Sequence, residues 1–193
     1  MRQNDLLIRN ENIQRLFDWY LKGDFIVNRK YQRKLVWTIE EKQQFINSIL
    51  SDYPVPLFLL AITSESRYEI IDGMQRLNAI FAFIKGEYSV NFNGQEGYFD
   101  LQTMAVTKEL MDTGMYIQKA PLLDRTLCSQ YVNYQLPLSI TNFEDRQIEE
   151  IFRRINATGR QLSSQDLRQA GTTHPFSELV RKISIAIRRD SSP

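Results

Sequence analysis

Apolar residues follow two different periods along this chain of 193 residues, which indicates a domain that mixes helices and strands. Spacings of three and four residues, as on one face of a helix, occur over residues 13–21, 45–50, 74–84, 148–155 and 176–187. Short apolar runs bounded by polar turns predict strands over residues 25–27, 57–63 and 68–71. Alternation over residues 88–94 ends in Asn93-Gly94, which predicts a hairpin.

Residue types at the segment ends support these boundaries. Gly23 ends the first helix, and Thr38 with Glu41 forms the pair of a capping box before the second. In the less regular part we expect a helix over residues 103–111 and a strand over residues 131–140. The chain is expected to form a single domain overall, whose parts are a core of residues 1–140 and a helical C-terminal part of residues 141–193 packed on it.

Composition excludes several classes of protein. The 24 Lys and Arg nearly cancel the 23 Asp and Glu, so any nucleic-acid surface must be local. Basic residues gather over residues 29–34, and from Arg153 onward eight basic residues face three acidic ones. A single cysteine, Cys128, excludes a disulfide within the chain and fits a reducing compartment. No apolar run is long enough to cross a membrane, so we expect a cytoplasmic protein.

The most informative local pattern is an apolar run that breaks at Asp72-Gly73 and passes into a helix with Gln75 and Arg76 in its first turn. A helix start offers unpaired backbone N–H groups and the positive end of the macrodipole, and a guanidinium adds a bidentate phosphate donor. A phosphate-bearing ligand therefore fits here. The alternative needs no ligand, because Asp72 with Gln75 also matches a capping box.

Other kinds of site are missing from the sequence. It contains neither the Gly-x-x-x-x-Gly-Lys-Ser/Thr loop nor the Gly-x-Gly-x-x-Gly fingerprint of common nucleotide sites. The only histidine, His174, cannot make a His-Asn-His nuclease site or a Ser-His-Asp triad. Carboxylates and basic groups remain. At the turn, Asp72 could hold Mg²⁺ against phosphate oxygens, Gln75 could position a water, and Arg76 could neutralise charge on a transferred phosphoryl group.

Four motifs occur in a fixed order along the chain. They are Tyr-Gln-Arg…Trp at residues 31–37, Pro-x-Pro at 54–56, Ile-Asp-Gly-x-Gln-Arg-Leu at 71–77 and Phe-x-Arg-x-Asn-x-x-Gly-x-x-Leu-Ser at 152–163. In this order the chain resembles the N-terminal domain of GmrSD-type restriction enzymes over roughly residues 28–169. The family usually has Asp-Gly-Gln-Gln-Arg, and here Met74 replaces the first Gln and removes one side-chain donor.

The resemblance implies an α+β fold of the ParB/sulfiredoxin-like type, with a mixed sheet, flanking helices and a nucleotide site. It assigns catalysis to Asp72, Gln75 and Arg76, with Mg²⁺ on Asp72. The nucleotide-binding residues that it implies are Arg33, Gly73, Arg76, Arg153 and Asn156. Because one arginine cannot neutralise a triphosphate, we expect Arg33 and the segment 153–156 to converge on the turn.

The function implied by this resemblance is an NTP-binding and NTP-hydrolysing regulatory module of a modification-dependent restriction or phage-defence system. Its nuclease domain or subunit would lie outside this chain. Two alternatives stay open: a DNA-binding or modification-sensing module without NTPase activity, and a scaffold that has lost ligand binding, which Met74 favours. Arg153 and Asn156 also have a simpler explanation. Arg153 would offset the dipole at the C-terminus of a helix, and Asn156 would cap that terminus.

Overall fold

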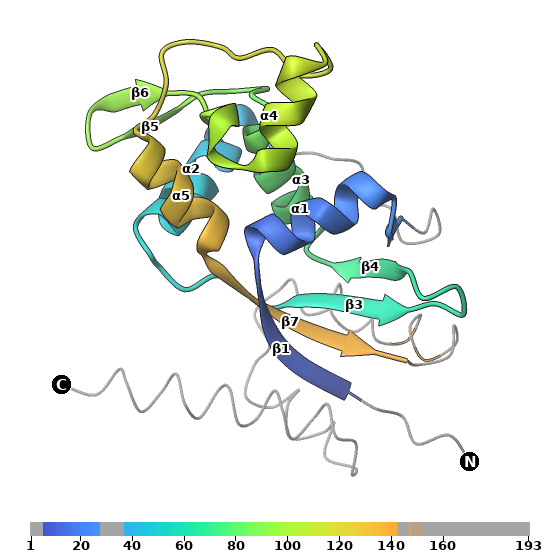
Figure 1. Cartoon of the computed structure of the whole chain (residues 1–193). Helices are drawn as coiled ribbons and strands as arrows, with labels where there is room; N and C mark the ends of the chain where they lie inside the picture. Colours follow the sequence, from blue (N-terminus) through green and yellow to red (C-terminus); the bar gives the residue numbers. More distant parts are fainter. Residues whose placement is uncertain (1–5, 28–36, 143–146, 148–149, 151–193) are drawn as a thin grey trace, which may run out of the picture. The chain divides into compact units, whose positions relative to one another are not determined.

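The computed structural model describes residues 6–27, 37–142, 147 and 150. The chain divides into two units, residues 1–148 and 149–193, and the fold described below is that of the first (Figure 1). Apart from residue 150, the predicted elements from residue 148 onward, together with Arg33, Arg153 and Asn156, lie outside the described residues.

A five-stranded mixed sheet forms one layer of this unit. Its strands lie in the order β1-β7-β3-β4-β2, with bounds Leu6–Asn12, Gln135–Thr141, Phe58–Ile62, Tyr68–Asp72 and Phe25–Ile26. β1 with β7 and β3 with β4 are antiparallel, whereas β3 with β7 and β2 with β4 are parallel. The predicted α+β class with a mixed sheet is therefore confirmed, while the ParB/sulfiredoxin-like assignment stays a prediction.

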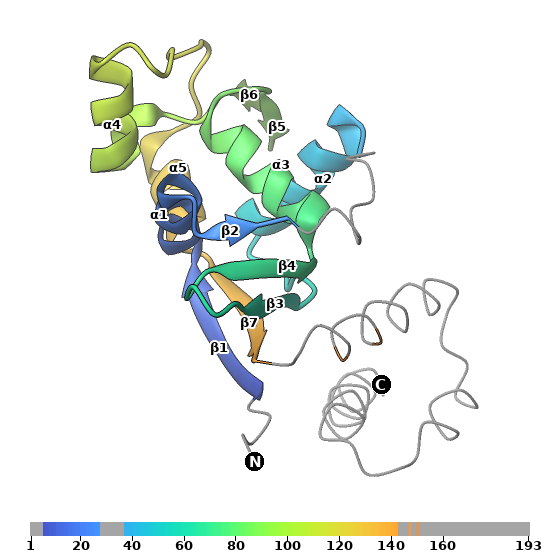
Figure 2. The same ribbon diagram turned by 90° about the vertical axis from the view of Figure 1, so that its right-hand side faces the viewer.

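The five α-helices of the described residues lie on the same side of the sheet (Figures 1 and 2). Their bounds are Ile13–Lys22 for α1, Ile39–Leu50 for α2, Met74–Ile84 for α3, Ala105–Asp112 for α4 and Arg125–Asn133 for α5. A 3₁₀ turn at Leu101–Thr103 precedes α4. The predicted hairpin is present as β5 (Val90–Phe92) and β6 (Gln95–Gly97).

The core lies between the sheet and these helices, and α3 is at its centre. Strands contribute alternate residues, such as Phe58 and Leu60 of β3 and Leu138 of β7, because successive side chains point to opposite faces. Eight of the eleven residues of α3 are buried, which is far more than one amphipathic face would require. The start of α3 is therefore held by a helix that is packed nearly all round.

Most predicted elements agree with the structure, and two differences are informative. The expected strand over residues 131–140 is wrong in its first part, since residues Arg125–Asn133 form α5. Asp124 caps this helix by accepting a hydrogen bond from the Thr126 N–H, and Cys128, Tyr131 and Val132 bury one face of it. β1 was not predicted, because only its first three residues are apolar and the remaining four are polar.

The helix expected over residues 103–111 is present with shifted bounds, as the 3₁₀ turn followed by α4. Within the described part of the chain, no helix has the length and apolar character needed to cross a membrane.

Candidate functional site

The predicted strand, turn and helix are all present at the candidate site. β4 ends at Asp72, Gly73 is the N-cap residue, and α3 begins at Met74. The pairing of β4 with β3 shifts by one residue here, with Leu59 opposite Asp72 and Leu60 opposite Ile70. Such an irregularity adds a residue to one strand and bends its end, and so it directs the turn toward the start of the helix.

Two independent constraints require glycine at position 73. Its φ of 102° lies in the left-handed region, which residues with a Cβ seldom adopt. A Cβ atom built there would also lie 2.5 Å from Cδ1 of Phe58, whose side chain is fully buried. The turn therefore closes directly onto the ring of Phe58.

The guanidinium of Arg76 is buried beneath this turn. Its Nη1 donates to the carbonyl oxygen of Pro56 and, at 3.2 Å, to that of Leu57. Its Nη2 donates to the Leu57 oxygen at 3.2 Å and to Oδ2 of Asp72 at 2.6 Å. The guanidinium carbon lies 4.4 Å from the ring centroid of Phe58, a cation–π contact. One side chain thus joins the segment before β3, the end of β4 and the start of α3.

This environment gives Arg76 a positioning role. The residue is only 9% exposed, and burial lowers the pKa of its guanidinium, with the Asp72 carboxylate acting in the opposite direction. Asp72, in contrast, keeps 44% of its side chain exposed. Asp72 is therefore the member of this ion pair that has a surface open to a metal ion or a ligand.

The N-terminus of α3 has no side-chain cap. Gly73 has no side chain to offer, and the Asp72 carboxylate bonds to Arg76 instead, so the capping box of Asp72 with Gln75 is not formed. Three other helices are capped: Asn12 caps α1, Asp124 caps α5, and α2 has the complete box of Thr38 and Glu41 that the sequence predicts. α4, like α3, has no side-chain cap and no acidic residue in its first turn, but Thr107 is its one buried residue. The first turn of α3 also has no acidic residue to offset the helix dipole.

Gln75 connects the turn to the start of α2. Its Oε1 accepts a hydrogen bond from the backbone N–H of Trp37 at 3.4 Å. The Trp37 ring packs against Phe45 of α2, with 5.5 Å between the ring centroids. Arg33 stands only four residues before Trp37 in sequence, but its convergence with Arg153 on this turn stays a prediction.

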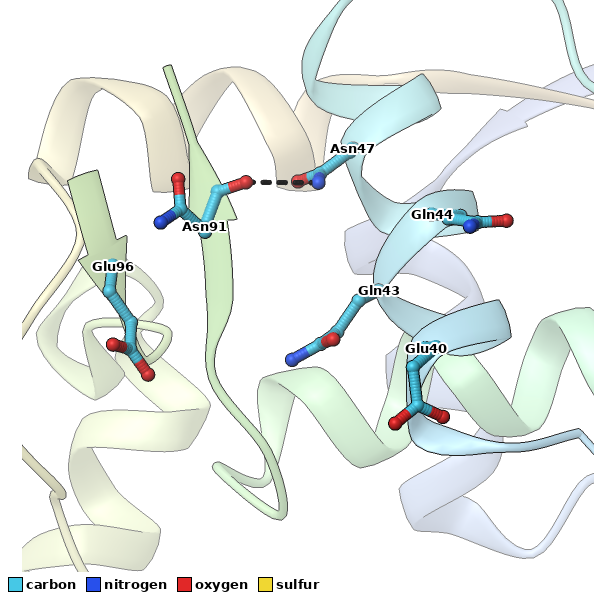
Figure 3. A pocket seen from close by; sticks show the side chains of 6 residues that line it. All are labelled: Glu40, Gln43, Gln44, Asn47, Asn91 and Glu96. Carbon is cyan, nitrogen blue, oxygen red and sulfur yellow. Dashed lines mark hydrogen bonds between the residues drawn. The ribbon is translucent and has the colours of Figure 1, made fainter. Parts of the chain in front are cut away.

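A polar groove between α2 and the β5–β6 hairpin has a different chemistry (Figure 3). It has a volume of about 470 Å³ and is lined by Glu40, Gln43, Gln44, Asn47, Asn91 and Glu96. The Asn47 Nδ2 donates across it to the Asn91 carbonyl oxygen at 3.0 Å. Its lining combines two carboxylates with no basic residue, so it repels phosphate groups.

Other chemistries have little support among the described residues. No group of three or more His, Cys, Asp and Glu residues is placed there to hold a metal ion. Burial raises the pKa of the Cys128 thiol to about 11, so this cysteine is not an activated nucleophile. A Mg²⁺ ion at Asp72 would not need such a cluster, because Mg²⁺ is commonly held by one or two carboxylates with substrate phosphates and water.

Comparison with known proteins now defines the family. The model of the GmrSD restriction endonuclease N-terminal domain matches residues 3–172, which is most of the chain. The chain therefore belongs to this family of restriction-enzyme domains, in agreement with the motifs in its sequence. This membership puts the protein in the context of restriction and phage defence. No curated protein and no solved structure gives a significant match.

The first prediction concerns the close approach of Gly73 to Phe58. Gly73→Ala is expected to lower the free energy of unfolding by about 2–4 kcal/mol, since it adds overpacking to left-handed strain. Gly114 is a matched control, because its φ is also positive, at 76°, but a Cβ there would have nothing within 4 Å. Gly114→Ala should cost only about 1 kcal/mol. Equal losses in chemical denaturation would contradict the packing constraint.

The second prediction concerns the buried guanidinium. Arg76→Lys should destabilise the domain by about 2 kcal/mol or more, because an ammonium group cannot reproduce the planar set of bonds. Arg67, whose side chain is 43% exposed and pairs with Glu65, provides the comparison. Arg67→Lys should change the stability by less than about 0.5 kcal/mol. Urea unfolding of both variants tests this, and an Arg76→Lys variant as stable as the parent would refute the structural role.

Proposed function

We propose that this domain binds a nucleoside triphosphate at the N-terminus of α3 and hydrolyses it with Mg²⁺. In this way it would act as the regulatory module of a modification-dependent restriction or phage-defence system. The observation that carries the proposal is the uncapped start of a nearly fully buried helix, directly beside a half-exposed carboxylate. A helix N-terminus in this state favours an anion through its N–H groups and its dipole.

The phosphate groups would accept hydrogen bonds from the backbone N–H groups of Met74, Gln75 and Arg76. The proposed role of Asp72 is to hold Mg²⁺ against the phosphate oxygens, and that of Gln75 is to orient the attacking water. Arg76 fixes the orientation of the Asp72 carboxylate, through the bond of 2.6 Å, and adds positive charge behind the turn. Glycine at position 73 lets this turn close.

A triphosphate carries more negative charge than one helix start and one ion pair can balance. We propose that Arg33, Arg153 and Asn156 supply the remaining contacts. Arg33 and Asn156 stand at named positions of the family motifs, and Arg153 directly precedes the motif arginine, Arg154. The proposal also includes a nuclease domain or subunit as the partner that the nucleotide state controls. The acidic groove beside α2 is not part of this site, because its two carboxylates would repel the ligand.

A second candidate function is DNA binding by the same basic residues. The local excess of basic residues after residue 152 favours it, with eight basic residues against three acidic. A domain that has lost all ligand binding is the third candidate, and Met74 in place of the usual Gln favours that outcome.

Thermal-shift measurements with the full chain separate these candidates. Each NTP with Mg²⁺, inorganic phosphate and a modified DNA duplex would be tested in turn. At about 100 times its dissociation constant a ligand adds roughly 2.7 kcal/mol of stability, so an NTP should raise the melting temperature clearly. Stabilisation by DNA alone would favour the second candidate. No stabilisation by any of these ligands would favour the scaffold.

The third prediction tests the metal-binding carboxylate. Asp72→Asn keeps an oxygen that can accept the hydrogen bond from Arg76 but removes the charge that attracts Mg²⁺. We expect this variant to lose the Mg²⁺-dependent part of the NTP-induced thermal shift and to lose NTP turnover. Asp112→Asn, at the exposed end of α4, is the control and should respond like the parent. Parental turnover by Asp72→Asn would exclude the catalytic role.

A further inference from the structure

Trp37 lies beside the turn that we propose as the phosphate site. The bond of 3.4 Å from its backbone N–H to the Gln75 side chain ties it to the second residue of α3. The residue is neither fully buried nor fully exposed. Phe45 meets the indole at an interplanar angle of 67°, an edge-type contact, and no second ring among the described residues touches it. Among the described residues, therefore, no aromatic ring stacks face to face on the indole.

Phe58, which lies at the turn, and Trp19 are already covered by other parts of the protein. Phe58 is fully buried, and Gly73 closes over its ring while Arg76 covers a face. Trp19, the second tryptophan, is 6% exposed and stacks on Tyr68 with 4.4 Å between the centroids. Neither ring can receive a ligand without unpacking the core.

We propose that Trp37 stacks on the nucleobase of the nucleotide whose phosphates bind at the N-terminus of α3. This inference rests on the proposed function and adds to it the residue that recognises the base. The geometry suits the ligand, because a nucleotide extends from its phosphates through the ribose to the base. Its phosphates would lie at the first turn of α3, and its base would reach the segment that Gln75 holds beside that turn.

Stacking on an indole also determines which ligands the site accepts. Every nucleobase has a π-face, so an aromatic platform binds purines and pyrimidines with little discrimination, favouring the bases that stack most strongly. The Gln75–Trp37 bond uses the backbone of Trp37 and leaves the indole free of that interaction. We therefore expect a site that takes several nucleoside triphosphates, and purine nucleotides more tightly than pyrimidine nucleotides.

The fourth prediction separates the base from the phosphates. ATP and inorganic triphosphate, each with Mg²⁺, would be titrated by calorimetry into the parent, Trp37→Leu and Trp37→Tyr. Leucine keeps an apolar contact with Phe45 but has no π-face, whereas tyrosine keeps both. We expect Trp37→Leu to bind ATP roughly tenfold or more weakly than the parent, and Trp37→Tyr to retain most of the affinity. Inorganic triphosphate should bind all three proteins equally.

Each other outcome is decisive. Equal ATP binding by the parent and Trp37→Leu would overturn the stacking role and leave the phosphate site standing. Equal loss of ATP and triphosphate in Trp37→Leu would show that Trp37 only supports the fold of the turn, which also overturns it. A parent that binds neither ligand would refute the proposed function and this inference with it. Circular dichroism of both variants confirms that each is folded before the titrations.

Tryptophan fluorescence gives an independent reading of the same contact. Stacking on a base should quench Trp37 when ATP binds, whereas inorganic triphosphate should leave the emission nearly unchanged. The buried Trp19 supplies a constant background, so the ATP-dependent quenching should disappear in Trp37→Tyr. Quenching that persists in Trp37→Tyr would come from Trp19 and would contradict the proposal.

Discussion

The buried guanidinium of Arg76 is the interaction on which this site depends. It bonds to the carbonyl oxygens of Pro56 and Leu57 and to the carboxylate of Asp72, and it lies over the ring of Phe58. A buried charge is costly unless hydrogen bonds and an opposite charge compensate it, and here both are present. Because the bonded groups come from before β3 and from the end of β4, the charge can be satisfied only when both segments and α3 are in place.

This arrangement stabilises the turn and leaves the helix start without a side-chain cap. The N-cap residue of α3 is glycine, and the carboxylate of Asp72, one residue before it, is engaged by Arg76. In the part of the chain that the structure describes, the first turn of α3 thus has neither a side-chain cap nor an acidic residue of its own to offset the helix dipole. In contrast, α2 begins a short distance away and satisfies its own first turn with Thr38 and Glu41. In the proposed function, this difference between the two helix starts favours an anion at α3 over α2.

Local signals in the sequence are sufficient to predict much of this fold. The capping box of Thr38 and the turn at Asp72-Gly73 were predicted because each depends on residues close in sequence. The helix α5 was missed because the Tyr-Val pair at residues 131–132 favours a strand, and tertiary burial of one helix face overrides that preference. The burial of Arg76 could not be predicted, since its carbonyl partners are 19 and 20 residues away. The Pro-x-Pro motif can be recognised in the sequence. Nothing in the sequence indicates that the carbonyl oxygen of Pro56 accepts a hydrogen bond from Arg76.

The central claim is that the backbone N–H groups at the start of α3 receive the phosphates of a nucleotide. Amide ¹H–¹⁵N NMR spectra, recorded while ATP with Mg²⁺ is added to the full chain, test it most directly. If the claim is correct, the amide signals of Met74, Gln75 and Arg76 should shift most, and inorganic triphosphate should shift the same three signals. Unchanged signals at these three positions, with ATP bound or with the largest shifts elsewhere, would contradict it.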